Sequence, residues 1–210
     1  MSHGYSYVAI TDHSKSLGVA GGLSDAQLLD HINEIHELDS IYSDIRVLAG
    51  TEVDIRTDGS LDYSDEMLSQ LDFVVASIHS GLRQDKASLT QRLVRAMQNP
   101  HVRVIGHPTG RILGDRDPYE VDFDAVMAEA ARTHTCLEIN AHYYRLDIND
   151  VLCRKARESG VKVIISTDSH SSENFENLHY GVATAQRGWL ERSHVLNAGS
   201  LDELLAYKVS

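Results

Sequence analysis

The chain has 210 residues and a formal net charge of −12, with 42% hydrophobic and 24% charged residues. This composition is typical of a globular protein and argues against disorder, and an acidic chain of this kind lacks the broad basic face that binds long stretches of nucleic acid. No apolar segment approaches membrane-spanning length, no secretory signal is recognisable, and the two cysteines lack a C-x-x-C spacing. We therefore expect one cytoplasmic domain over residues 1–210, with any DNA contact confined to a few nucleotides.

Six short apolar segments, rich in β-branched residues, alternate along the chain with amphipathic segments. Such runs are typical of strands that are buried on both faces of a parallel sheet. They cover residues 7–13, 47–52, 73–79, 102–107, 136–140 and 161–170. Helical spacing covers residues 24–38, which open with a capping box at Ser24 and Gln27, and then residues 87–97, 123–131, 148–156 and 201–207. Strand followed by helix predicts a right-handed parallel α/β fold, although six strands are too few for the usual eight-stranded barrel.

The predicted strands end in residues of the types that bind metal ions. These candidate ligands are His13, Glu52, His79, His107, Asp168 and His170. In a barrel of parallel strands the carboxyl ends meet at one face, so we expect the six side chains to converge. A mixed set of imidazole and carboxylate ligands suits Mn, Zn or Fe rather than Ca. The sequence therefore predicts a polynuclear metal site, in which a carboxylate such as Glu52 can bridge two cations.

Two arginines follow predicted strand ends and are candidates for binding phosphate. Arg111 closes the segment Gly106-His-Pro-Thr-Gly-Arg, and Arg145 follows Asn140-Ala-His-Tyr-Tyr. A guanidinium group matches the geometry of phosphate oxygens, so either arginine could clamp a phosphodiester. Each of these two arginines could equally well pair with a surface carboxylate instead of a phosphate.

Several motifs resemble those of the PHP (polymerase and histidinol phosphatase) superfamily. They are Thr11-Asp-His13-Ser, Gly50-Thr-Glu52-Val-Asp-Ile, Ser77-Ile-His79-Ser, Gly106-His107-Pro-Thr-Gly-Arg111, Glu138-Ile-Asn140-Ala and Thr167-Asp168-Ser-His170. More narrowly, residues 20–24, 58–63, 145–147 and 180–197 are similar to the C-terminal PHP domain of bacterial and archaeal family X DNA polymerases. The similarity extends over nearly the whole chain.

The resemblance implies a distorted TIM-like (β/α)7 barrel that holds two to three Mn²⁺ or Zn²⁺ ions. It implies that Glu52 bridges the first two ions, with Asp168 on the first. His79 and His107 would complete the second, and His13 and His170 would bind the third. It also implies an exonuclease or related 3′-end phosphoesterase activity in DNA repair.

The family opens with a strand that carries further ligands, and this sequence begins after it. We therefore expect the barrel without its first strand, which a polymerase domain or another chain could supply.

Three interpretations of the function stay open at this point. The first is a metal-dependent phosphodiesterase acting on DNA 3′ ends, with Asp168 and Glu52 at the metals and Arg111 and Arg145 on the phosphate. The second is a free-standing phosphatase of small phosphomonoesters, similar to histidinol phosphatases, which the acidic charge favours. The third is a truncated domain that is inactive alone, because a working metal site needs its full ligand set.

Overall fold

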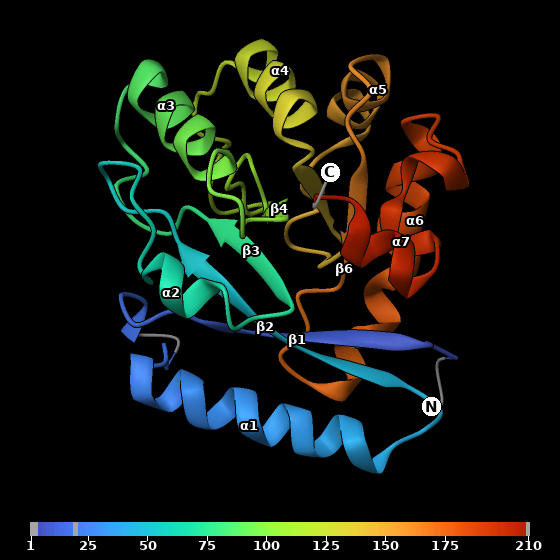
Figure 1. The fold of residues 1–210 in the computed structure, drawn as a ribbon. Coiled ribbons are helices and arrows are strands. Elements are labelled where there is room, and N and C mark those ends of the chain that lie inside the picture. Colours follow the sequence, from blue (N-terminus) through green and yellow to red (C-terminus); the bar gives the residue numbers. More distant parts are fainter. Residues whose placement is uncertain (1–3, 19–20, 209–210) are drawn as a thin grey trace.

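A computed structural model describes residues 4–18 and 21–208 of the chain. Six parallel strands form one sheet in chain order, and the sheet curls into a half-barrel (Figure 1). The strands are β1 (Tyr7–His13), β2 (Arg46–Asp54), β3 (Phe73–Ser77), β4 (Val104–Ile105), β5 (Cys136–Asn140) and β6 (Val163–Ser166). This confirms the expected α/β fold, a TIM-like barrel short of a strand. Ala20, the first residue of one of the family-like segments, lies outside the described residues.

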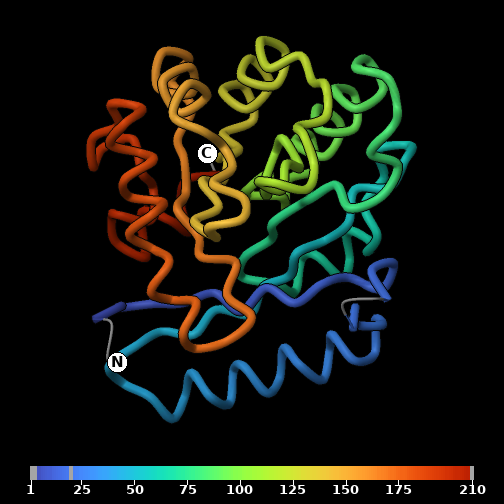
Figure 2. Tube along the Cα trace, turned by 180° about the vertical axis from the view of Figure 1, so that it is seen from behind, coloured from blue at the N-terminus to red at the C-terminus, as the bar shows by residue number. Residues whose placement is uncertain are grey.

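Seven α-helices connect or follow the strands. They are α1 (Asp25–Ile41), α2 (Asp65–Leu68), α3 (Lys86–Met97), α4 (Phe123–Thr133), α5 (Asp150–Glu158), α6 (Leu178–Arg187) and α7 (Leu201–Ala206) in the described part of the chain. Helix α1 runs beneath β1 and β2, and α3 to α6 follow one another around the outside of the sheet (Figures 1 and 2). The predicted capping box is present, since Ser24 Oγ accepts from the backbone N–H of Gln27 while Gln27 Oε1 accepts from that of Ser24.

Helix α6 was not predicted from the sequence, and the helix predicted over residues 148–156 begins later. Helix α6 packs so closely on Ile165 of β6 and on Ala141, which follows β5, that a Cβ atom at residue 181 would clash with both. A glycine therefore stands at this position and interrupts the apolar pattern of α6. Glycine lowers helix propensity, so close packing hides this helix from the sequence pattern. Helix α5 starts at Asp150, because the Asn149 side chain accepts a hydrogen bond from Leu152 and caps it.

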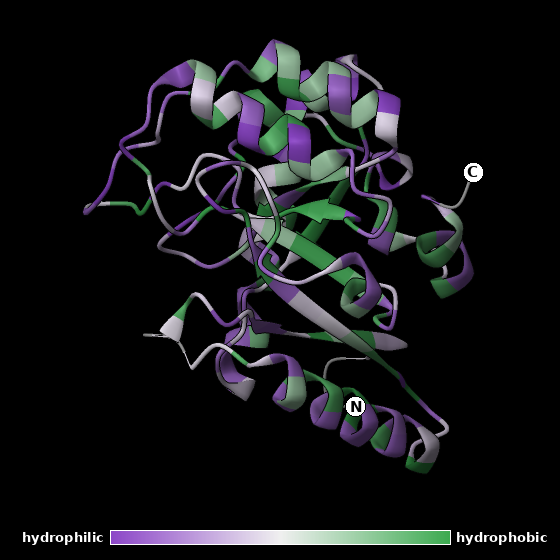
Figure 3. Ribbon diagram, turned by 60° about the vertical axis from the view of Figure 1, so that its left-hand side comes forward, coloured by the Kyte–Doolittle hydropathy of each residue, from purple (hydrophilic) through white to green (hydrophobic). Residues whose placement is uncertain are grey.

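Strands β2 to β6 are largely buried on both faces, as the apolar runs indicated, while β1 is half-buried along its length (Figure 3). On the outer face, residues such as Ala49 and Val53 of β2 pack against Leu28 and Ile32 of α1. On the inner face, residues near the beginnings of five strands form a second core, which Leu204 of α7 completes. The strand residues of this inner core are Leu48, Phe73, Val104, Cys136 and Ile164. Helix α7 therefore closes the amino-terminal end of the half-barrel and leaves polar side chains at the other end.

The two outermost strands, β1 and β6, are linked by a segment near residue 197. The Asn197 side chain pairs with the backbone of Ile165 on β6, accepting from its N–H at 3.1 Å and donating to its carbonyl at 2.7 Å. The Tyr7 hydroxyl on β1 donates to the Asn197 carbonyl at 3.2 Å. This segment therefore satisfies part of the β6 edge, which would otherwise present unpaired backbone groups.

Among the described helices, none is long and apolar enough to cross a membrane.

Candidate metal centre

Glu52 lies at the centre of a cluster of three histidines, which come from the ends of different strands. The parallel register places His13 of β1 directly beside Glu52 of β2. Glu52 Oε2 lies 3.4 Å from His13 Nδ1, while Oε1 lies 3.3 Å from His79 Nε2 and 2.9 Å from His107 Nε2. His79 and His107 follow β3 and β4, so the structure brings together the candidate ligands of four successive strands.

The cluster holds Glu52 in its charged form. Burial alone would raise the pKa of this carboxyl, but hydrogen bonds from His107 and His79 outweigh burial and hold its pKa well below the usual value. Burial alone would lower the pKa of His79, because burial disfavours the charged imidazolium. Hydrogen bonds to Asp54 and Glu52 outweigh burial and raise the pKa of His79 to about 9. For His13 burial dominates, and its pKa is lowered.

The donor atoms of this cluster fit a divalent metal ion. One ligand atom each from His13, Glu52 and His79 lies within 4.8 Å of the others. Two donors bound to one zinc ion at about 2.0–2.1 Å in a tetrahedral arrangement are roughly 3.3 Å apart, close to the separations between Glu52 and these histidines. The buried nitrogen His13 Nδ1, which faces Glu52, also has no hydrogen-bond partner. Buried polar atoms are normally satisfied, so both observations support a metal site.

Asp168 and His170 lie beside this cluster at the end of β6. The Asp168 carboxylate accepts a hydrogen bond from Asn140 Nδ2 at 3.0 Å, and His170 Nδ1 lies 2.9 Å from the Asp168 carbonyl oxygen. The ring centres of His170 and His13 are 6.2 Å apart, and the His170 side chain is largely exposed. Since β1 and β6 are at opposite ends of the strand order, this proximity reflects the curl of the sheet.

The two candidate phosphate-binding arginines have different surroundings. Arg145 Nε lies 3.4 Å from Asp168 Oδ2, and its buried Nη1 atom has no hydrogen-bond partner. Arg111 instead donates from Nε to the Arg145 carbonyl at 2.7 Å and from Nη2 to the Leu146 carbonyl. Arg145 therefore lies next to the candidate metal centre, while Arg111 supports the backbone that carries Arg145.

Two carboxylates that lie within the quoted motifs, but to which the sequence analysis assigned no role, support the cluster. Asp54 Oδ1 lies 3.1 Å from His79 Nδ1. Glu138 accepts from the backbone N–H of His107 at 2.6 Å and from the Ser166 hydroxyl, and burial raises its pKa to about 7. The sequence held a signal for both carboxylates. Asp54 lies two residues from Glu52 on β2, and Glu138 lies two residues from Asn140 on β5. Residues two apart on a strand share a face of the sheet.

No protein-family profile matches the chain, but several curated proteins are similar to it. Over 204 residues it is 44% identical to the protein of Bacillus subtilis (strain 168) named DNA polymerase/3′-5′ exonuclease PolX, an alignment that covers 97% of this chain and 36% of that protein. It is 30% identical over 203 residues to a probable phosphatase of Shewanella sediminis, covering 92% of this chain and 78% of the relative. A probable phosphatase of Clostridium acetobutylicum is 33% identical over 146 residues, which are 64% of this chain and 56% of that protein.

The curled parallel sheet, with histidines and a carboxylate at its strand ends, defines the class as a TIM-like α/β fold with a candidate metal centre. Within this class the chain belongs to the PHP-type family, together with these relatives. It spans 36% of the length of the Bacillus protein.

Proposed function

We propose that this chain is a metal-dependent phosphoesterase whose reaction takes place at the Glu52 cluster. The observation that carries the proposal is the contact of one buried carboxylate with three histidines from the ends of successive strands. The relatives named as exonuclease and probable phosphatases support phosphoester hydrolysis over other metal-dependent reactions.

The proposed metals are two to three Mn²⁺ or Zn²⁺ ions. In this proposal Glu52 bridges two ions, His79 and His107 hold one of them, Asp168 holds the other, and His13 with His170 holds a third. Bound divalent ions would polarise the phosphoryl oxygens and supply a nucleophile at neutral pH. Asp54 orients the ring of His79, and Glu138 holds the backbone of His107 in place.

Arg145 is the proposed phosphate-binding group. Its side chain is 19% exposed beside Asp168, and its Nη1 atom has no hydrogen-bond partner within the chain, so this guanidinium keeps a free donor for a phosphate oxygen. Arg111 contributes by fixing the carbonyls of Arg145 and Leu146 and thereby the position of the Arg145 side chain. Arg145 thus acts directly on the substrate phosphate in this proposal, and Arg111 acts through Arg145.

The proposed substrate is the phosphodiester at a DNA 3′ end. The relative that is 44% identical carries 3′-5′ exonuclease in its name, and the alignment covers nearly the whole of this chain. The net charge of −12 is compatible with this substrate if the enzyme contacts only the last nucleotides. A polymerase domain, or another chain that adds a strand beside β1, would provide any wider contact.

A small phosphomonoester is the second candidate substrate. The probable phosphatase of Shewanella sediminis aligns over 78% of its own length, so the similarity extends over most of a shorter relative. A small phosphate ester also needs no basic face, in agreement with the acidic chain.

The test is a comparison of Glu52→Gln with Glu66→Gln, a matched change at an exposed residue of α2. Metal content per chain is measured by elemental analysis, and hydrolysis is measured with labelled single-stranded DNA and a phosphomonoester panel. We expect Glu52→Gln to lose bound metal and at least 100-fold in rate on the preferred substrate, while Glu66→Gln behaves as wild type. A Glu52→Gln variant that retains metal and full activity would overturn the proposal. The preferred substrate of the wild type decides between DNA and small esters.

A further inference from the structure

Three consecutive aromatic residues form an exposed turn after β5. In this aromatic turn, defined as His142, Tyr143 and Tyr144, the rings of His142 and Tyr143 stack at 4.7 Å with an angle of 19° between their planes. The rings of Tyr143 and Tyr144 are 4.3 Å apart. Tyr143 is 47% exposed and Tyr144 is 53% exposed. Large aromatic rings bury much of their surface when they serve only packing, so this turn offers ring faces to a ligand.

The aromatic turn is tied directly to the candidate metal centre by one amide. Asn140 Oδ1 accepts from the backbone N–H of His142 at 3.0 Å, while Asn140 Nδ2 donates to Asp168 Oδ2 at 3.0 Å. The residue that follows the turn is Arg145, whose Nε lies 3.4 Å from the same Asp168 oxygen. A phosphate at Arg145 would therefore have the aromatic turn as its neighbour.

Backbone hydrogen bonds fix the turn on both sides. The N–H of Arg145 donates to the His142 carbonyl at 2.7 Å, and the N–H of Leu113 donates to the Tyr144 carbonyl at 2.6 Å. Leu113 belongs to a surface hollow lined by residues 111–118, which include Arg111 and Arg116. The rings are thus held in place at the edge of a hollow whose charged lining residues are two arginines and two aspartates, Asp115 and Asp117.

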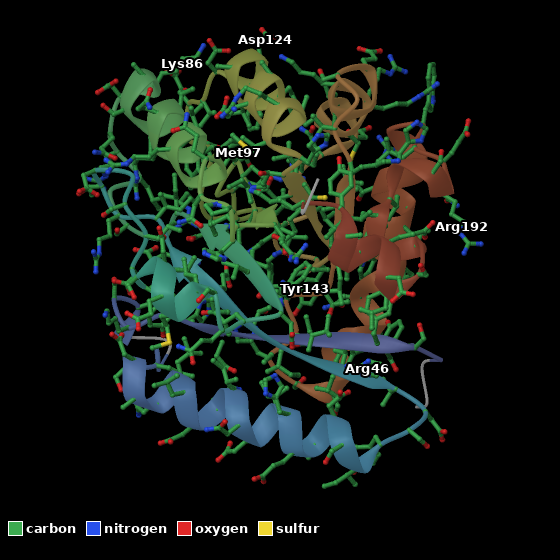
Figure 4. The ribbon with its side chains drawn as sticks, in the orientation of Figure 1. Arg46, Lys86, Met97, Asp124, Tyr143 and Arg192 are labelled. Atoms are coloured by element: carbon green, nitrogen blue, oxygen red, sulfur yellow. The ribbon has the colours of Figure 1, made fainter. Side chains whose placement is uncertain are left out.

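Tyr180 of α6 is a further exposed tyrosine of the chain. It is 41% exposed and its ring lies 3.8 Å from that of His179. The side-chain hydrogen bond with Tyr144 raises the pKa of Tyr143. Tyr143, labelled in Figure 4, marks the position of this surface.

We propose that the aromatic turn stacks a base of single-stranded nucleic acid whose phosphate lies at Arg145. This inference rests on the proposed phosphoesterase function and adds to it a surface that binds a base of the substrate. Every base has a ring face, so such stacking is tolerant of sequence and adds to a small number of phosphate contacts. It also accounts for binding by a chain with a net charge of −12, because stacking does not depend on a basic surface.

The test compares Tyr143→Ala/Tyr144→Ala with Tyr143→Phe/Tyr144→Phe, which retains both rings. Tyr42→Ala, at an exposed tyrosine just after α1, is the control for losing a surface ring. Binding is measured by fluorescence anisotropy with an oligothymidylate of about twelve nucleotides, within the usual site size for single strands. A second probe has abasic sites at its last two 3′ nucleotides, and each titration is done in Mn²⁺ and in EDTA.

We expect the double alanine variant to bind the oligothymidylate roughly 5- to 150-fold more weakly than wild type, the range found when one stacking ring is removed. The phenylalanine variant and Tyr42→Ala should bind as wild type. On the abasic probe the alanine variant and wild type should bind equally, and the salt dependence of wild-type binding should be shallow, at about one phosphate contact. Equal affinity of the alanine variant and wild type for both probes would overturn the inference.

The stacking role and the proposed phosphoesterase function can each fail in these experiments while the other stands. Wild-type chain that hydrolyses phosphoesters while the alanine variant binds DNA normally would exclude the stacking role and leave the phosphoesterase intact. Ring-dependent DNA binding in a chain without hydrolysis would leave the stacking role and exclude the phosphoesterase. Thermal unfolding midpoints of all variants show whether a loss of binding follows from a loss of fold.

Discussion

A single oxygen of Asp54 holds His79 at two points: Oδ1 lies 3.1 Å from the backbone nitrogen of His79 and 3.1 Å from its Nδ1. Because Nδ1 faces Asp54, the opposite ring nitrogen, Nε2, faces Glu52 at 3.3 Å. A carboxylate in this position fixes both the orientation and the tautomer of a metal-binding histidine. Asp54 is therefore a positioning residue for the candidate metal centre.

The first prediction is that Asp54→Asn weakens metal binding without unfolding the protein. Asparagine keeps an oxygen that can accept from the backbone N–H of His79, but it lacks the charge that orients the ring. We expect the dissociation constant for Zn²⁺ or Mn²⁺ to rise about 10- to 100-fold. Titration against a competing chelator measures it, with Asp44→Asn at an exposed site as the control. Unchanged affinity in Asp54→Asn would show that Asp54 does not position His79.

The second prediction concerns Gly106, which lies directly under Glu52. A Cβ atom at residue 106 would clash with Ser77 Oγ and would lie 2.8 Å from Val75 Cγ1. Overpacking of this kind typically costs about 1–3 kcal/mol, so Gly106→Ala should lower the free energy of unfolding by that amount. Urea unfolding is the measurement. Gly18→Ala, where nothing lies within 4 Å of the added carbon, should leave stability nearly unchanged. Equal stability of the two variants would mean that the interior has free space at Gly106.

The strands and their order could be predicted because both of their faces are buried. A continuous apolar run such as residues 163–165 leaves little ambiguity, and parallel strands must bring their carboxyl ends to one edge. The convergence of His13, Glu52, His79 and His107 followed from this rule alone. Strand β4 is shorter than its apolar run, however, because its pairing covers only Val104 and Ile105.

What the sequence did not reveal depends on contacts between distant residues. Arg111 donates to the carbonyls of residues 145 and 146, and no local sequence pattern encodes that pairing. Asp54 and Glu138 were missed because a carboxylate within an apolar strand does not indicate which neighbour it supports. Their place two residues from recognised motif residues was the available signal.

The third prediction is that Asn197→Ala loosens the link between β1 and β6. The variant loses both hydrogen bonds to Ile165 and leaves a partly buried N–H and carbonyl unpaired. We expect a loss of about 1–3 kcal/mol in unfolding free energy and a greater tendency to self-associate through the exposed edge. Urea unfolding and light scattering test the two effects. Asn33→Ala on the exposed side of α1 should show neither, and a similar response of both variants would argue against a specific role for Asn197.

The fourth prediction is a pH-dependent contribution from Asp62, which joins the loops that follow β1 and β2. This buried carboxylate accepts from the backbone N–H of Ser16 at 2.7 Å and from Arg56 Nη2 at 2.9 Å. Burial alone would raise the pKa of Asp62, but the hydrogen bonds from Ser16, Ser14 and Arg56 together lower it below its ordinary value. The charged form is thus favoured in the folded state.

A folded-state pKa below the unfolded value, which is about 3.9 for aspartate, gives stability that is complete above that pH and is lost as the pH falls through the folded pKa. Asp62→Asn should therefore reduce the unfolding free energy by about 1–3 kcal/mol at pH 7, and the difference from wild type should shrink below about pH 4. Urea unfolding at pH 7 and at pH 3 measures the difference in unfolding free energy between Asp62→Asn and wild type, with Asp30→Asn on the surface of α1 as the control. A difference between Asp62→Asn and wild type that stays constant down to pH 3 would show that the loss comes from packing rather than from the charge of Asp62.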